Sequence, residues 1–182
     1  MHEYNYQTQG YPSRELSLID ALVIHWGGPN ADSTPEQVDN YHINNNGWYG
    51  MGYHALCMKS GLVYHTQPLE AVSYHCGSGS PPKPPDAPDY VTSGIGWNNW
   101  HTVGILVNCG YATRRDADGN TIRTVDVLPT AAQIVALRWY ANVWLLGQLG
   151  RSVAVLSHNE ISQGGTECPG AWLRQKIAAG KI

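Results

Sequence analysis

The sequence has no hydrophobic run long enough to cross a membrane and no targeting segment at its amino end. A transmembrane helix needs about 20 consecutive apolar residues, and no window of this 182-residue chain approaches that length. Residues 1–17 lack the cationic region followed by an apolar region that forms a secretory signal peptide. These absences predict a soluble chain without a signal peptide.

Charge is also sparse and evenly mixed. The chain has 11 Lys and Arg residues against 14 Asp and Glu residues, and it has no basic cluster. Binding to nucleic acid phosphates or to anionic lipid depends on clustered positive charge. We therefore expect a partner that is neither nucleic acid nor a membrane.

Phenylalanine is absent, and the aromatic residues are 7 Trp, 11 Tyr and no Phe. Amphipathic rings of this kind suit surfaces that stack on sugars or hold peptides. Ordinary core packing is the alternative interpretation for most of them.

Four cysteines are too few and too scattered to suggest a disulfide framework. They are Cys57, Cys76, Cys109 and Cys168, and disulfide-dependent domains are smaller and richer in cysteine. We expect mostly free thiols.

Length and hydrophobic patterning predict a single α/β domain over residues 1–182, with a central mixed β-sheet flanked by helices. One domain has about 150 residues on average. Helices are expected after two capping boxes, Thr34–Gln37 and Thr130–Gln133. Short apolar runs alternate with these helices, as in α/β folds. Strands are expected at 21–28, twice within 51–66 around a turn at 59–61, at 101–110 and at 152–158.

One segment breaks this alternation. Residues 77–89 read GSGSPPKPPDAPD, and such a Gly/Ser/Pro-rich run cannot pair in a sheet. We interpret it as a surface insertion within the single domain, because the segments after it are needed to complete the sheet.

Two of the eight histidines, His25 and His158, come at the ends of apolar runs that predict central strands. Ligand sites of α/β sheets gather at the carboxyl ends of strands. Together with Cys168, these residues would provide two imidazoles and a thiolate, a known ligand set for a catalytic zinc with a fourth position for water. From the residues alone, buried neutral side chains are an equally good interpretation.

Four segments together resemble the zinc-dependent N-acetylmuramoyl-L-alanine amidases of the type 2 family, relatives of phage amidase lysins and peptidoglycan recognition proteins. The segments read VIHWGG, GYHALCMKSGLVYHTQPLEAVSYHCG, HTVGILV and SHNEISQGGTECPGAWL. The resemblance covers roughly residues 22–173 and is specific because the segments occur in the right order at plausible spacings.

The resemblance implies that Zn²⁺ is the cofactor and that His25, His158 and Cys168 are its ligands. The glycine-containing loop between the last two would bring Cys168 back beside His158. This ligand set would leave a net charge of about +1, enough to acidify a bound water and to polarise an amide carbonyl.

The resemblance also implies two catalytic residues. Tyr53, in GYH, matches a tyrosine whose phenol can donate a hydrogen bond to the attacked carbonyl or hold the water; the alternative is a packing residue on a strand. Thr166 stands two positions before Cys168, where some phage relatives have a lysine. Because a hydroxyl has no positive charge, the oxyanion would be stabilised mainly by zinc and Tyr53. Some relatives also have a glutamate on the strand written here as GILVN, which has none.

His75, in SYHCG, matches a histidine that borders the substrate groove in relatives. It is expected to bind substrate, and a supporting position behind the metal or a structural role are the alternatives. We interpret His54 and His65 as structural.

The implied activity is hydrolysis of the amide bond between N-acetylmuramic acid and L-alanine in bacterial peptidoglycan. A non-catalytic peptidoglycan-binding recognition module is the alternative, and such modules usually lack the complete ligand set. The chain resembles a small phage or prophage endolysin, a monomer made in the host cytoplasm and released to the cell wall. A secreted enzyme whose signal has been removed would look the same.

Overall fold

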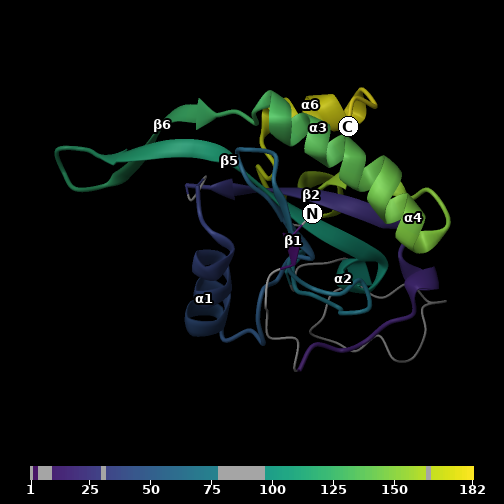
Figure 1. Cartoon of the computed structure of the whole chain (residues 1–182). Coiled ribbons are helices and arrows are strands. Elements are labelled where there is room, and N and C mark those ends of the chain that lie inside the picture. The colour runs from purple at the N-terminus through teal and green to yellow at the C-terminus, as the bar shows by residue number, and fades with distance from the viewer. Residues whose placement is uncertain (1, 4–9, 30–31, 78–96, 163–164) are drawn as a thin grey trace.

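The computed structural model describes residues 2–3, 10–29, 32–77, 97–162 and 165–182. In these residues the chain forms a seven-stranded mixed sheet with helices on both faces (Figure 1). The α/β fold with a central mixed sheet, predicted from the sequence, is therefore confirmed. Of the helices in the described part of the chain, none is long and apolar enough to cross a membrane.

The sheet has the strand order β1-β4-β3-β5-β2-β7, and β6 pairs with β5 outside this path. Strand β2 lies between β5 and β7 and is parallel to both. The pairs β3–β4 and β5–β6 are antiparallel. The strands are β1 (His2–Glu3), β2 (Ala21–Gly28), β3 (Ala55–Cys57), β4 (Val63–His65), β5 (Thr102–Arg115), β6 (Thr121–Val127) and β7 (Ala154–Ser157).

Helices connect these strands and follow the last one. They are a 3₁₀ turn (Leu16–Leu18), α1 (Pro35–Asn46), α2 (Trp97–His101), α3 (Ala131–Trp139), a π-helical continuation (Tyr140–Leu145), α4 (Leu146–Leu149), α5 (His158–Ile161) and α6 (Ala171–Ala178). The sequence pattern does not predict α6, because a helix of eight residues shows too few turns for a clear helical period. The predicted insertion at 77–89 lies outside the described residues from position 78 onward.

Strand β2 is buried on both faces, which explains its unbroken apolar sequence. Ala21, Leu22, Val23 and Ile24 are each at most 4% exposed. A strand with neighbours on both edges and packed layers on both faces needs apolar side chains throughout. His25 continues the strand and is only 1% exposed, so a polar ring is held at the end of a hydrophobic strand.

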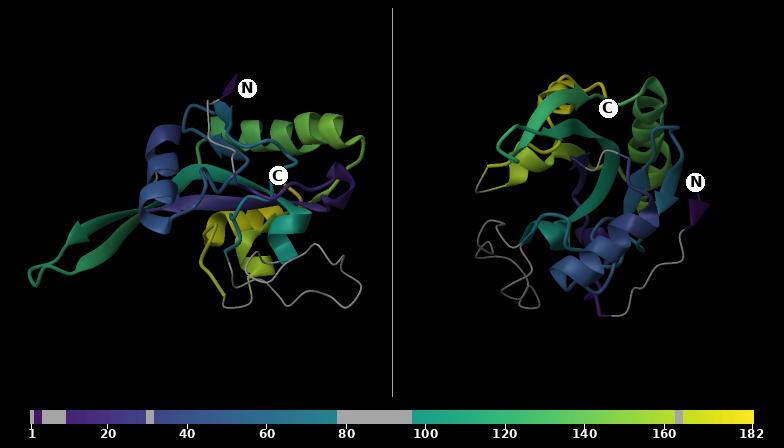
Figure 2. Two further views of the ribbon diagram at one scale, coloured as in Figure 1. Left: turned by 90° about the horizontal axis from the view of Figure 1, so that it is seen from below. Right: turned by 90° about the vertical axis from the view of Figure 1, so that its left-hand side faces the viewer.

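Two hydrophobic clusters cover opposite faces of the sheet. In the larger cluster, Leu137 of α3 and Leu173 of α6 pack with Leu22 and Ile24 of β2. In the smaller cluster, Val38 of α1 packs with residues of β3 and β5. Figures 1 and 2 show α3 and α6 together on one side of the sheet and α1 on the other. The alternation of side chains along each strand separates these two layers.

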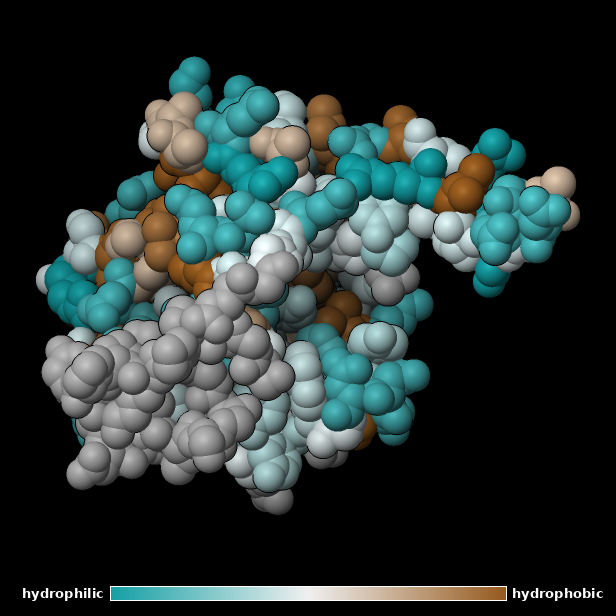
Figure 3. All heavy atoms as spheres, turned by 180° about the vertical axis from the view of Figure 1, so that it is seen from behind, coloured by the Kyte–Doolittle hydropathy of each residue, from teal (hydrophilic) through white to brown (hydrophobic). Residues whose placement is uncertain are grey.

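Strands β5 and β6 continue beyond the sheet as a two-stranded ribbon that projects from the body (Figures 1 and 2). The apolar pattern predicts a strand at 101–110, whereas β5 runs to Arg115. Residues 113–115 are exposed, as is most of β6, and Figure 3 shows mainly hydrophilic side chains on the ribbon. A ribbon with little buried surface lacks the apolar pattern that reveals a strand in a sequence.

Both predicted capping boxes are present. Thr34 caps α1 through Gln37, and Thr130 caps α3 through Gln133. The Thr130 hydroxyl also donates a hydrogen bond of 2.8 Å to the carbonyl of Lys59, in the turn between β3 and β4. The second box therefore also ties α3 to the sheet.

Replacing Thr130 by Ala should lower the free energy of unfolding by about 1–2 kcal/mol, because the variant loses a helix cap and leaves the Lys59 carbonyl without its donor. Thr34→Ala is the matched control, since Thr34 makes the corresponding box at the exposed start of α1. It should cost about 1 kcal/mol or less. Urea unfolding of the two variants measures the difference, and equal losses would contradict this account.

Candidate metal centre

His25 and His158 lie at the carboxyl ends of neighbouring parallel strands. Strands β2 and β7 are in register at Ile24 and Ser157. The next residue in each segment is His25, still within β2, and His158, the first residue of α5, so both reach the same edge of the sheet. The centroids of the two imidazole rings are 4.5 Å apart. Parallel pairing therefore brings together two histidines that are far apart in the sequence.

The loop after α5 carries Cys168 back to these histidines. The N–H of Asn159 donates to the carbonyl of Cys168 at 2.9 Å, and its side-chain amide donates to the carbonyl of Thr166. The Sγ atom of Cys168 accepts a hydrogen bond of 3.4 Å from the N–H of Trp26. The loop is therefore fixed to both β2 and the start of α5.

The three side chains present a geometry that fits a zinc ion. One ligand atom from each of His25, His158 and Cys168 can be chosen so that all three lie within 4.8 Å of one another. The distance from His25 Nδ1 to Cys168 Sγ is 3.7 Å. Tetrahedral zinc with ordinary Zn–N and Zn–S bond lengths places such atoms about 3.6 Å apart, so a metal could enter with little rearrangement.

Neighbouring groups hold both histidine rings. His25 Nε2 lies 3.0 Å from His75 Nδ1, which leaves His25 Nδ1 to face Cys168. The ring of His158 is hydrogen-bonded to the backbone carbonyl of Cys76. Metal-binding histidines typically use their second nitrogen for an outer partner of this kind.

A second combination of side chains shares His25 and consists of His25, His75 and Cys76. All three of its members are buried, whereas His158 and Cys168 as whole residues have intermediate exposure. A catalytic metal needs a position that water and substrate can reach, so the first combination is the better candidate.

Burial keeps these groups uncharged in the chain without metal. It lowers the pKa of His25 well below its ordinary value, and the neighbouring His158 and His75 lower it further. Burial also lowers the pKa of His158 and raises the pKa of the Cys168 thiol to about 12. Neutral imidazoles are ready to bind a metal, whereas the thiol must release its proton when it does so.

Tyr53 stands beside the candidate metal centre. Its ring centroid lies 5.1 Å from that of His25. Burial raises the pKa of its phenol, as does the proximity of Cys168 and Cys76. The phenol is therefore protonated at physiological pH and is available as a hydrogen-bond donor.

A cleft of about 390 Å³ opens beside Tyr53. Its walls come from the end of β2, from α1 and from β5, and its lining residues are Trp26, Gly27, Ser33, Gln37, Val38, Tyr41, His42, Tyr53 and Leu106. A further hollow of about 300 Å³ shares Ser33 and Gln37 with it and reaches Tyr111 at the base of the ribbon. The two form a groove between α1 and the ribbon, and its lining residues Tyr53 and Trp26 are neighbours of His25 and Cys168.

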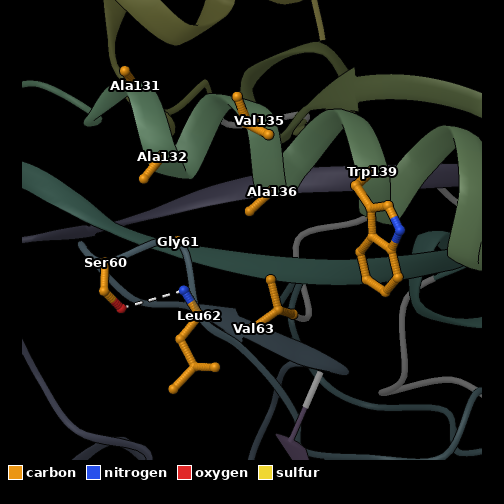
Figure 4. A pocket seen from close by; sticks show the side chains of 9 residues that line it. All are labelled: Ser60, Gly61, Leu62, Val63, Ala131, Ala132, Val135, Ala136 and Trp139. Carbon is orange, nitrogen blue, oxygen red and sulfur yellow. Dashed lines mark hydrogen bonds between the residues drawn. The ribbon is translucent and has the colours of Figure 1, made fainter.

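Another cavity, of about 610 Å³, lies away from these residues. Figure 4 shows it between the turn that carries Ser60 and Leu62 and the side chains of Ala132, Ala136 and Trp139 on α3. Its lining holds no histidine, cysteine or acidic residue. Volume alone therefore does not identify the site.

The ribbon is tied to the loop that carries Cys168. The guanidinium of Arg123 lies over the ring of Tyr111, with 4.6 Å to the ring centroid, and also over Trp26. Its Nη1 donates to the carboxylate of Glu167 at 2.7 Å. Glu167 directly precedes Cys168, so this contact links β6 to the metal-binding loop.

Thr166 and His75, both expected to act in the site, have neighbours that suggest supporting positions. The Thr166 hydroxyl oxygen accepts the N–H of Cys168 at 3.2 Å. His75 is 4% exposed and contacts His25, which favours the position behind the metal over the groove wall. Sequence reasoning missed the N–H of Trp26 and the carbonyl of Cys76, since a backbone group leaves no signal in residue type.

The comparison with protein families agrees with this geometry. Residues 15–171 match the family model of N-acetylmuramoyl-L-alanine amidase. The chain belongs to this amidase family. Among curated protein sequences, none matches the chain.

Solved structures show the same fold in other members and relatives of the amidase family. The endolysin amidase LysCS from Clostridium intestinale URNW is 21% identical, with 98% of this chain and 94% of that chain covered and a TM-score of 0.61. The Ph2119 endolysin from a Thermus scotoductus MAT2119 bacteriophage is 22% identical, with coverage of 94% and 88% and a TM-score of 0.58. Peptidoglycan recognition protein LE, in complex with tracheal cytotoxin, is 17% identical, with coverage of 95% and 86% and a TM-score of 0.63.

We expect this amidase to bind about one zinc ion per chain, and Cys168→Ala should lose most of it because a ligand and its negative charge are removed. Cys76→Ala is the control, since Cys76 belongs only to the buried combination. It should keep its zinc. Elemental analysis of both purified variants tests the assignment, and zinc lost from Cys76→Ala but retained by Cys168→Ala would reverse it.

Proposed function

We propose that the protein is a zinc-dependent N-acetylmuramoyl-L-alanine amidase that cleaves the bond between N-acetylmuramic acid and L-alanine in bacterial peptidoglycan. The observation that carries the proposal is the convergence of His25, His158 and Cys168 beside Tyr53 at the end of a groove. The amidase family match, over residues 15–171, supports the nature of the bond.

His25, His158 and Cys168 would hold the zinc ion. When bound, zinc would supply a Lewis acid that polarises the amide carbonyl and makes a water molecule more acidic. Three protein ligands leave a further position for water or substrate. His158 and Cys168 are partly exposed, whereas His25 is buried, so substrate would approach the metal from the side of His158 and Cys168.

Tyr53 would stabilise the negative charge that develops on the carbonyl oxygen. Its phenol keeps its proton because burial raises its pKa, so it can donate a hydrogen bond to an oxyanion. Thr166 contributes more weakly, because its hydroxyl carries no charge and its oxygen already accepts the N–H of Cys168.

The groove between α1 and the ribbon is suited to the stem peptide and the adjoining sugar. Aromatic rings of Trp26, Tyr41 and Tyr111 line it, and such rings provide apolar faces with polar edges. Structural likeness to recognition protein LE, whose complex contains monomeric diaminopimelic acid-type peptidoglycan, supports this class of ligand.

We further propose that the enzyme serves as a phage or prophage endolysin, as its likeness to two endolysins suggests. A non-catalytic recognition module is the alternative, because recognition proteins share the fold. Function depends on the site rather than on the fold, and the complete set of His25, His158, Cys168 and Tyr53 favours the enzyme.

Digestion of purified peptidoglycan should release new alanine amino termini without new reducing sugar ends, because the proposed bond is an amide and not a glycosidic bond. Mass spectrometry of the soluble fragments and amino-terminal labelling measure both products. Binding without any release would favour the recognition module. Reducing ends that appear in step with clearing of the wall would refute the amidase assignment.

Tyr53→Phe should lower kcat by about 10²–10³ with zinc content and fold preserved, the usual loss when one oxyanion donor is removed. Thr166→Ala should cost about 10-fold. Tyr49→Phe is the control, since Tyr49 is exposed and lies on neither wall of the groove. Turnover and zinc content should be measured together, and a zinc-replete Tyr53→Phe enzyme with normal turnover would exclude the role assigned to the phenol.

A further inference from the structure

We propose that Thr102 is a positioning residue for the metal centre, acting through His75 to determine which nitrogen of His25 carries the proton. The inference rests on the proposed function, in which His25 is a zinc ligand. Thr102 is the first residue of β5 and follows α2 directly. It does not touch the candidate metal-binding atoms, and although it lies in the segment HTVGILV, the sequence gives it no role of its own.

A chain of hydrogen bonds runs from His25 to the backbone of α2. His25 Nε2 lies 3.0 Å from His75 Nδ1. On the far side of the ring, His75 Nε2 lies 3.1 Å from the hydroxyl oxygen of Thr102. That hydroxyl donates to the carbonyl of Asn98 at 2.5 Å. All four residues are buried, with side chains between 1% and 9% exposed.

The direction of this chain is determined at its outer end. The Asn98 carbonyl can only accept a hydrogen bond, so the single proton of the Thr102 hydroxyl points toward it. The Thr102 oxygen is then an acceptor for His75 Nε2, which must carry a proton. The carbonyl oxygen of Thr102 lies 3.4 Å from the same nitrogen. It too can only accept a hydrogen bond, which again favours a proton on His75 Nε2.

At the inner end of this series of hydrogen bonds, the donor between His25 and His75 follows because both imidazole rings are neutral. His75 is 4% exposed and, in the described part of the chain, has no carboxylate among its hydrogen-bond partners, so its ring is neutral, carries one proton and has Nδ1 as an acceptor. His25 Nε2 must therefore be the donor in the contact between the two rings. His25 is 1% exposed and, among the described residues, likewise has no carboxylate partner, so its ring holds a single proton on Nε2. Its Nδ1 is therefore unprotonated, and this is the atom 3.7 Å from Cys168 Sγ.

The thiol of Cys76 is a further polar group that contacts both His75 and Thr102. Its Sγ lies 3.1 Å from His75 Nδ1 and 3.8 Å from the Thr102 hydroxyl oxygen. A thiol is a weaker hydrogen-bond donor than an imidazole N–H. His75 Nδ1 therefore accepts its hydrogen bond from His25 Nε2 and not from the Cys76 thiol. The thiol can direct its proton to the remaining lone pair of the Thr102 oxygen. Thr102 thus satisfies three neighbours and keeps His75 Nδ1 available to His25.

The first test is the protonation pattern of the metal-free chain. Long-range ¹⁵N–¹H NMR spectra of ¹⁵N-histidine-labelled protein should show His25 and His75 both protonated at Nε2 and unprotonated at Nδ1. This measurement needs no variant. Protonation of either ring at Nδ1 would overturn the inference.

The second test compares Thr102→Val with Thr102→Ser. The valine variant keeps the shape of the side chain but loses the hydroxyl, and zinc affinity should fall by about 10–100-fold, as for other outer partners of metal ligands. The serine variant restores the hydroxyl and should bind zinc within about 3-fold of the wild type. Competition with a chromophoric chelator measures the affinity, and the cobalt-substituted protein should show altered visible bands in the valine variant alone.

Thr66→Val is the matched control, because Thr66 is also fully buried and donates one hydrogen bond, to the carbonyl of Tyr53, outside this chain of contacts. Its zinc affinity should stay at the wild-type level. Wild-type affinity in folded Thr102→Val would overturn the inference while leaving the proposed function intact. A wild-type chain that binds no zinc would overturn the proposed function and this inference with it.

Discussion

The buried imidazole of His25 needs a partner for each of its two nitrogens, and the arrangement of the site follows from how this need is met. The ring is 1% exposed at the end of an apolar strand, where an unsatisfied polar atom would be costly. His75 occupies one nitrogen, and the other faces Cys168. The two partners lie on opposite sides of the ring. Nε2 therefore points into the protein interior, and Nδ1 is available to a metal ion.

The electrostatics of the site have the same origin. Burial disfavours charge, so His25 stays neutral, Tyr53 keeps its proton, and the pKa of Cys168 is raised. A neutral imidazole can bind a metal and a protonated phenol can donate to an oxyanion. The thiol is the only one of these groups that must change its charge, and the positive charge of the metal would stabilise the thiolate that results.

The two faces of the sheet differ in function: one stabilises the domain and the other forms the groove. The face under α3 and α6 holds the larger hydrophobic cluster, which stabilises the domain. The face under α1 holds the smaller cluster and the groove, whose walls include Val38 and Leu106. Strands β2 and β7 are paired side by side and bring His25 and His158 together at the candidate metal centre. The sheet therefore positions the histidines, while a loop supplies Cys168 and is held by its hydrogen bonds.

The sequence by itself determined the fold class, the positions of β2 and β7, both capping boxes and the residues that resemble a ligand set, because each is encoded in a local pattern of neighbouring residues. Only the tertiary structure decided how these residues are supported. His25 and His75 are 50 positions apart, Trp26 and Cys168 are 142 apart, and strand register and loop closure bring each pair together. The role inferred for Thr102 depends on the direction of hydrogen bonds between buried groups, which arises only when distant segments pack against one another.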